Sequence, residues 1–207
     1  MNTVAYLMSA VVWPLPLVFT PIPFAIPFWI IYVWSRQGER KVLCRQPVTE
    51  RADRGSWKLI DYGSKAAKVA ALLVACTTPA WGEGGSRIAI YAAGLLLMLS
   101  GASLRRHCFR TLGDHFTFQV AVPREHQIVT AGVYRWVRHP SYTGGMLFNV
   151  GIGIALTNWA SALILAAGMA AVYIYRVHVE EQALVRAHGS AYTEYMRQTK
   201  RFIPFVI

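Results

Sequence analysis

The chain has 207 residues, of which 55% are hydrophobic and 15% charged, and its formal net charge is +11. A soluble domain usually carries about a quarter charged residues, so this composition excludes an ordinary water-soluble globule and indicates a lipid environment. The positive charge is compatible with nucleic acid or with a membrane surface, and the placement of the basic residues decides between them.

The N-terminal 35 residues contain no charged side chain. This segment is too long and too uniformly apolar for a signal peptide, and no basic region precedes it, so we expect it to remain as membrane structure. Five prolines between positions 14 and 27 argue against one straight helix. Two alternatives stay open for this first span, a kinked helix and a re-entrant pair.

Four further apolar runs reach or approach the length of about 18 residues that a membrane span needs. In chain order they are Leu59–Trp81, which carries Lys65 and Lys68 near its start, Ile88–Leu104, Ser141–Thr157 and Trp159–Tyr175. The two lysines are expected to extend toward the membrane surface. A short turn at Asn158 joins the last two runs, which are therefore predicted to form a tight helical hairpin.

The basic residues are distributed as in a membrane protein. On a five-span model, every lysine and arginine except Arg87 falls on one side of the membrane. Cytoplasmic loops carry such an excess of positive charge. We therefore expect residues 36–58, residues 105–138 and the C-terminus in the cytosol. The expected location is the cytoplasmic membrane of a bacterium or archaeon, or the endoplasmic reticulum of a eukaryote.

The chain is predicted to form one membrane-embedded domain, residues 1–207, because no repeat, low-complexity tract or linker divides it. Residues 1–104 would supply the N-terminal spans, and residues 105–207 would form the half that carries the chemistry. No strand followed by a glycine-rich turn is present, so a Rossmann fold is excluded. The three cysteines are widely separated, with no pair at zinc-ligand spacing, so neither a metal site nor a disulfide is predicted.

Polar and aromatic residues concentrate in two segments of the C-terminal half. The first segment contains Gln119, His126-Gln-Ile-Val129, Gly132-Val-Tyr134, Arg138-His139-Pro140-Ser141-Tyr142 and Gly144. The second segment contains Arg176, Glu180-Glu181, Tyr192, Tyr195 and Arg201-Phe-Ile-Pro204. Both segments are expected on the cytosolic side, where they can form one site.

Arg176 and Glu180 are four residues apart and share one face of a helix, so a cation and an anion project together. The pair also has a purely structural interpretation, in which Arg176 extends to lipid headgroups and pairs with Glu180 on the helix surface. Likewise, His139 before Pro140 is a good helix start in any protein. From the residues alone, the structural and the functional interpretation both stay open.

In combination, these motifs resemble those of the isoprenylcysteine carboxyl methyltransferases. The resemblance covers about residues 105–207, whereas residues 1–104 match only in being membrane spans. It implies an all-α integral membrane enzyme with about five transmembrane helices and a cytosolic cofactor pocket formed by the C-terminal half. The implied reaction is methyl transfer from S-adenosyl-L-methionine to a lipophilic acceptor, such as the carboxylate of an isoprenylcysteine.

By this resemblance, Arg176 would face the methyl acceptor and orient its carboxylate. Glu181 is expected to tolerate substitution better than its neighbour Glu180. Such a cofactor needs aromatic faces for its sulfonium cation and polar groups for its two ends. The residues that would line its pocket are Gln119, His126, Gln127, Ile128, Val129, Tyr134, His139, Pro140, Ser141, Tyr142 and Glu180.

The sequence leaves the methyl acceptor open. Eukaryotic members of the family methylate prenylated proteins, but short relatives occur in prokaryotes, so the acceptor is a lipid-linked carboxylate, thiol or amine. The expected partners are the lipid bilayer and a lipophilic or prenylated substrate, with no nucleic acid and no obligate protein partner. Two other classes remain, an NADPH-dependent enzyme similar to sterol reductases and a non-enzymatic membrane protein.

Overall fold

The computed structural model describes residues 22–43, 55–113 and 128–203. The helices are α3 (Ile22–Leu43), α4 (Ser56–Thr77), α5 (Gly84–Leu112), the 3₁₀ helix η2 (Gly132–Arg135), α6 (Pro140–Ala155), α7 (Trp159–His188) and α8 (Ser190–Gln198). Among these described residues, the one pairing of strand type is a parallel bridge between Val137 and Lys200. The predicted all-α class is confirmed for this part of the chain.

The last four predicted runs each correspond to one helix, although two of these helices are longer than their apolar runs. The third run was expected to end at Leu104, but α5 continues to Leu112, and α7 continues past Tyr175 to His188. A helix does not have to end where its side chains become polar, because its backbone hydrogen bonds are satisfied internally. The polar turns of α5 and α7 therefore extend the bundle beyond its apolar part.

Two of the described helices, α5 and α7, are long and apolar enough to cross a membrane. Helix α6 has 16 residues, fewer than the roughly 20 that a straight span across a bilayer requires. Residues 1–21, most of the predicted first span, lie outside the described residues. The count of five spans therefore stays a prediction.

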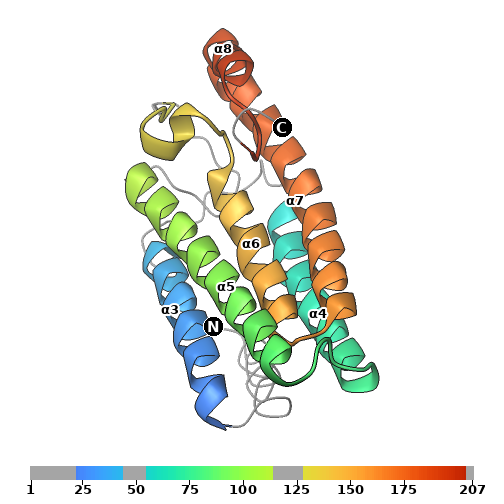
Figure 1. Ribbon diagram of the computed structural model, residues 1–207. Helices are drawn as coiled ribbons and strands as arrows, with labels where there is room; N and C mark the ends of the chain where they lie inside the picture. The colour runs from blue at the N-terminus through green and yellow to red at the C-terminus, as the bar shows by residue number, and fades with distance from the viewer. Residues whose placement is uncertain (1–21, 44–54, 114–127, 204–207) are drawn as a thin grey trace.

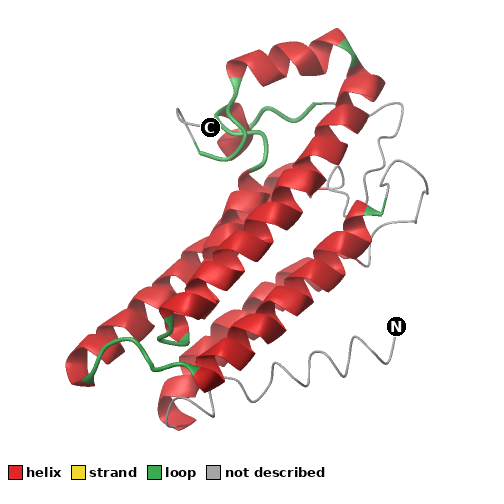
Figure 2. Cartoon of the chain, turned by 90° about the vertical axis from the view of Figure 1, so that its right-hand side faces the viewer, coloured by secondary structure: helices red, strands yellow, loops and turns green. Residues whose placement is uncertain are grey.

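The long helices run side by side, and helices from the two halves of the sequence are neighbours (Figure 1). Helix α5 packs against α6 and α3, while α7 packs against α4 and α6. Figure 2 shows α8 and the loops around it gathered at one end of this bundle. That end holds most of the polar residues that the sequence singled out.

Glycines allow α5 and α6 to approach closely. A Cβ atom on Gly101 of α5 would lie 2.6 Å from the backbone nitrogen of Phe148 in α6, and one on Gly94 would lie 2.7 Å from the Cα atom of Ala155. Such distances leave no room for a methyl group. Small residues thus bring the two helices together at both positions.

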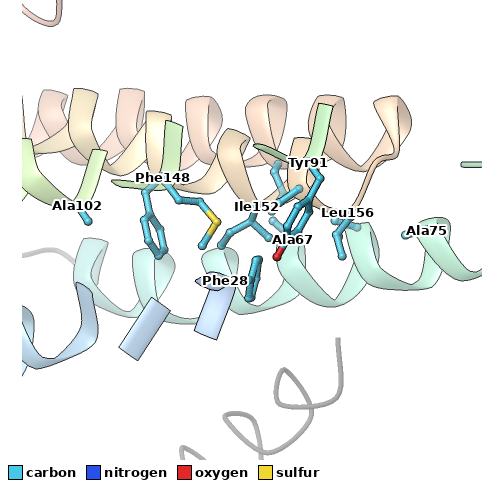
Figure 3. Packing of buried hydrophobic residues seen from close by; sticks show 12 residues of the cluster. Phe28, Ala67, Ala75, Tyr91, Ala102, Phe148, Ile152 and Leu156 are labelled. Atoms are coloured by element: carbon cyan, nitrogen blue, oxygen red, sulfur yellow. The ribbon is translucent and has the colours of Figure 1, made fainter. Parts of the chain in front are cut away.

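The apolar core lies between α3, α4, α5, α6 and α7 (Figure 3). Phe28, Phe148 and Ile152 are buried there, and Phe28 stacks on Tyr32 with ring centroids 6.2 Å apart. Close packing of this kind favours one arrangement of the helices. The core holds α6 and α7 in a fixed relation below the polar end.

The predicted hairpin at Asn158 is confirmed. Its side-chain oxygen accepts a hydrogen bond from the backbone N–H of Ser161 at 2.9 Å and so caps the N-terminus of α7. Its amide nitrogen donates to the hydroxyl of Thr78 at 2.7 Å, which ties the turn to the end of α4. The Ser161 hydroxyl in turn donates to the carbonyl of Ala71 at 2.6 Å. These bonds set the rotation of α7 about its axis.

Candidate functional site

The start of α6 lies beside the polar part of α7. His139 occupies the N-cap position and Pro140 the first turn, as the sequence predicted for a helix start. The backbone N–H of Tyr142 donates to the carbonyl of His139 at 3.1 Å. Tyr142 is thereby held in the first turn of α6, with its side chain toward α7.

Tyr142 joins the two charged residues that share one face of α7. Its hydroxyl donates to Glu180 Oε2 at 2.7 Å and accepts from Arg176 Nε at 3.2 Å. Arg176 is only 2% exposed, and its Nη1 atom also donates to the hydroxyl of Ser56 at the start of α4. We call Tyr142, Arg176 and Glu180 the Tyr142 cluster. It collects an anion, a cation and an aromatic ring from two helices.

Further tyrosines surround the carboxylate of Glu180. Burial, reinforced by the nearby negative charge of Glu180, raises the pKa values of Tyr134 and Tyr192 above their usual range. The ring of Tyr173 lies 5.0 Å from that of Tyr142. The hydroxyls of Tyr134 and Tyr192 therefore stay protonated at neutral pH and remain hydrogen-bond donors. Glu180 thus lies near neutral tyrosine side chains.

Glu181, the next residue of α7, contacts a different set of groups. Its carboxylate accepts from Arg138 Nε at 3.0 Å and from Arg201 Nη2 at 2.9 Å, and His139 Nε2 lies 3.4 Å from its Oε1 atom. Glu181 is 5% exposed, so its negative charge is removed from water. The two arginines compensate this charge. We call these four residues, Arg138, His139, Glu181 and Arg201, the Glu181 clamp.

The clamp holds the C-terminal segment against the loop that precedes α6. Backbone N–H groups of Arg138 and His139 donate to the carbonyls of Lys200 and Arg201 at 2.8 and 3.0 Å. The hydroxyl of Thr143 donates to the carbonyl of Phe202 at 2.7 Å. The segment after α8 thus runs along the start of α6 and closes this side of the site.

The structure divides the predicted site residues into three groups. Gln119, His126 and Gln127 lie outside the described residues. Tyr142, Arg176 and Glu180 come together in the Tyr142 cluster, and Tyr134 adjoins them. The remaining predicted residues lie nearby: Ile128 and Val129 are partly buried before η2, His139 belongs to the Glu181 clamp, and Pro140 and Ser141 form the first turn of α6.

The contacts of Glu181 were not expected from the sequence. Glu181 was expected to tolerate substitution better than Glu180, because it lies one position around the helix, and this expectation stays a prediction. In the structure Glu181 is the more buried of the two and has the larger number of charged partners. The sequence shows an arginine in each of the two motifs, Arg138 and Arg201. That both contact Glu181 depends on the tertiary fold.

Arg105 and Ser56 were also missed as parts of this region. Arg105 follows an apolar run and was expected in a cytosolic loop, but it lies in α5, and its Nη1 atom donates to the carbonyl of Ser141 at 3.1 Å. A Cβ atom on Gly145 would lie 2.9 Å from this Nη1 atom, so the glycine makes room for the guanidinium. Ser56 has no motif around it. Its contact with Arg176 follows only from the packing of α4 against α7.

The chemistry that this arrangement offers comes from the charged and aromatic groups of the Tyr142 cluster. No group of three or more His, Cys, Asp or Glu able to hold a metal ion is found in the described part of the chain. The Tyr142 cluster instead offers a guanidinium for an anion and a carboxylate with aromatic rings for a cation.

Comparisons with known proteins agree with the predicted family. The model of the isoprenylcysteine carboxyl methyltransferase family matches residues 94–186, which include the whole Tyr142 cluster. Protein-S-isoprenylcysteine O-methyltransferase B of Arabidopsis thaliana is 36% identical over 115 residues, 55% of this chain and 58% of the relative. The Homo sapiens protein-S-isoprenylcysteine O-methyltransferase is 32% identical over 115 residues, 55% of this chain and 40% of the relative. The chain thus spans about half the length of the curated relatives it matches.

A solved structure has a similar fold. The eukaryotic intramembrane Ras methyltransferase, an isoprenylcysteine carboxyl methyltransferase, matches with a TM-score of 0.52 over 100% of this chain and 88% of its own. The sequence identity is 20%, so this likeness concerns the fold alone. The fold is that of an integral membrane protein, in agreement with the composition.

Proposed function

We propose that this chain, whose residues 94–186 match the isoprenylcysteine carboxyl methyltransferase family, transfers a methyl group from S-adenosyl-L-methionine to the carboxylate of an isoprenylcysteine-like substrate. The observation that carries the proposal is the Tyr142 hydroxyl, which contacts Arg176 at 3.2 Å and Glu180 at 2.7 Å. One cation and one anion are thereby fixed in adjacent positions. They match an anionic acceptor and a cationic donor.

The residues around Glu180 fit the chemistry of the cofactor. When bound, S-adenosyl-L-methionine supplies an electrophilic methyl group on a sulfonium cation. Glu180 would hold the polar end through a charge-assisted hydrogen bond, and the rings of Tyr134 and Tyr142 would face the cation. The imidazole of His139, whose Nε2 atom lies 3.4 Å from Glu181 Oε1, would add a further polar group beside the cofactor.

The other predicted lining residues belong to the same proposal. Gln119, His126, Gln127, Ile128 and Val129 precede η2 in the sequence and would close the pocket from that side. Pro140 and Ser141 would contribute the backbone of the first turn of α6.

Arg176 would orient the acceptor. A guanidinium binds a carboxylate through two parallel hydrogen bonds, and such a pair fixes the direction of both oxygens. The contacts of Arg176 with Ser56 and Tyr142 hold the guanidinium in place before the substrate arrives. A carboxylate is already ionised at neutral pH. The protein therefore needs to align it and exclude water, not to remove a proton.

The membrane topology forms part of the proposal. We infer five spans, with the Tyr142 cluster and the C-terminus on the cytosolic side, because all basic residues except Arg87 then lie on that side. A single reporter cysteine at Ser190, in a chain whose own cysteines are replaced, tests this arrangement. Labelling from outside intact cells would overturn it, and labelling only after permeabilisation supports it.

Two measurements on the purified protein test the activity. S-adenosylhomocysteine should raise the melting temperature by mass action, whereas NADPH should not. Labelled S-adenosyl-L-methionine should then transfer its methyl group to an S-farnesylcysteine carboxylate, but not to a lipid amine or thiol. Stabilisation by NADPH alone would support the reductase alternative. Methylation of the amine or thiol alone would preserve the enzyme class and overturn the carboxylate acceptor.

A further inference from the structure

The outer face of α7 carries a groove that the proposed reaction does not use. It has a volume of about 390 Å³ and is lined mainly by apolar side chains. Ile174 is 63% exposed and Tyr175 is 42% exposed, although both are large and hydrophobic. The groove continues along Ala171 and His178 to Phe202 of the C-terminal segment.

A strongly basic hollow lies at the end of this groove. Its volume is about 310 Å³, and its lining includes Arg138, Arg197, Lys200 and Arg201. Arg201 lines both the groove and the hollow, so the two adjoin at this residue. The side chain of Arg201 remains 50% exposed while it contacts Glu181. An elongated apolar surface therefore ends in a group of cations.

The charges of the hollow are only partly balanced. Glu181 contacts Arg138 and Arg201, and Glu194 approaches Arg197 at 3.5 Å in a pair whose two side chains are exposed. Exposed ion pairs are weak and leave their cations available to another anion. Among the described residues, two carboxylates thus contact three of the four cations, and this part of the hollow keeps a net positive charge.

The groove lies on the opposite side of α7 from the Tyr142 cluster. Ile174 and His178 each lie two positions from Arg176 or Glu180, and two positions correspond to about 200° around an α-helix. Exposure agrees with this geometry, since Arg176 is 2% exposed and Ile174 is 63% exposed. A molecule bound in the groove is therefore separated from the proposed donor site by the helix itself, so the groove is not the acceptor site.

We propose that the groove and the hollow together bind one anionic phospholipid, with an acyl chain along α7 and the phosphate group in the hollow. A phosphate carries negative charge and several acceptor oxygens, which complement arginine and lysine. The apolar groove complements the acyl chain of the lipid, because it lies on a helix long enough to cross a membrane. The lipid lies against Arg201 and Phe202, and so against the segment that closes the site.

The test compares lipids with identical acyl chains on the full-length protein in a neutral detergent. Native mass spectrometry with equal amounts of phosphatidylglycerol and phosphatidylcholine should show preferential retention of phosphatidylglycerol. Lys200→Gln and Arg197→Gln should each weaken that retention about fivefold, since one basic residue contributes about that factor to the binding of an anionic lipid. Retention of phosphatidylcholine should not change in these two variants.

Two further variants separate the charge from the groove. Lys58→Gln removes an exposed cation from α4, outside the hollow, and should leave the preference intact. Ala171→Trp fills the groove without changing any charge and should weaken the retention of both lipids. Equal retention of the two lipids by the wild-type protein would overturn the proposal. So would a loss in Lys58→Gln as large as that in Lys200→Gln. A third result would also overturn the proposal: inorganic phosphate competes with the lipid, and Ala171→Trp retains both lipids as the wild type does. The hollow would then be a simple anion site.

Discussion

Glu180 and Glu181 are neighbours in the sequence, yet they belong to different parts of the molecule. Glu180 joins the Tyr142 cluster, where one hydroxyl links it to Arg176. Glu181 joins the Glu181 clamp, where Arg138 and Arg201 hold it. One residue step rotates the side chain by about 100° around the helix. That rotation directs one carboxylate to the proposed reaction site and the other to the scaffold that surrounds it.

The comparison shows that a pair of identical residues can combine two requirements. The proposed cofactor site needs an anion that is not already neutralised by structural partners. The loop before α6 and the C-terminal segment, in contrast, need an anion that pairs with their arginines. Substitutions at the two positions should therefore affect different measurements, and this expectation leads to four predictions.

The largest effect is expected for Glu181→Gln. Removing one partner of a buried ion pair costs about 3–5 kcal/mol, because the remaining charges lose their compensation. Since Arg201 is half exposed, we expect a loss of about 3 kcal/mol in the free energy of unfolding, measured by denaturation in detergent. Glu194→Gln, which removes an exposed carboxylate, is the control and should change stability by less than about 0.5 kcal/mol. Equal losses in both variants would contradict the clamp.

Glu180→Gln should affect binding more than stability. It keeps the shape of the side chain but removes the charge of the proposed charge-assisted hydrogen bond. We expect a loss of about 1.5–3 kcal/mol, or roughly tenfold to hundredfold, in the affinity for S-adenosylhomocysteine measured by calorimetry. The melting temperature without ligand should stay close to that of the wild type. An unchanged affinity would remove Glu180 from the cofactor site.

Arg176→Lys should lower turnover by at least about tenfold while leaving cofactor affinity nearly intact, because lysine cannot bind a carboxylate through two parallel bonds. Initial rates with a prenylcysteine carboxylate measure the effect. Arg186→Lys, at an exposed position of the same helix, is the matched control and should retain the wild-type rate. Wild-type turnover in Arg176→Lys would refute both the acceptor role and the carboxylate acceptor.

Tyr142→Phe should have the smallest effect of the four. It removes the hydroxyl that contacts Arg176 and Glu180, and a hydrogen bond of this kind contributes about 0.5–1.5 kcal/mol. We expect turnover to fall about threefold to tenfold, because both charged groups remain but are less well aligned. Tyr62→Phe, at an exposed position of α4, should have no effect. A Tyr142→Phe variant that lost stability as Glu181→Gln does would assign Tyr142 to the scaffold instead.

Much of the fold followed from the pattern of the sequence. Long apolar runs predicted the helices, Asn158 predicted the hairpin, and Pro140 after a polar residue predicted the start of α6. The spacing of Arg176 and Glu180 predicted their common face. Each of these features depends on residues close in the sequence, where the helical period and local hydrogen bonds are sufficient.

The residues at which the helices end were harder to predict from the sequence. The polar turns after Leu104 and Tyr175 were assigned outside the apolar runs, but α5 and α7 continue through them. Polarity marks where a helix leaves an apolar environment, not where its hydrogen bonding stops. Arg105 was placed in a loop for this reason, although it lies in α5 and contacts the first turn of α6.

The sequence by itself determined the helical class, the hydrophobic environment and the motifs that resemble those of the isoprenylcysteine carboxyl methyltransferases. Only the tertiary structure decided which charges meet. Ser56 and Arg176 are 120 positions apart, and Arg138 and Glu181 are 43 positions apart. Contacts at such separations depend on the rotation of each helix, and that rotation is set by glycine contacts between α5 and α6 and by the capping bonds of Asn158. The helical period fixes the angle between Glu180 and Glu181, but the packing of α6 and of the C-terminal segment determines what each of them contacts.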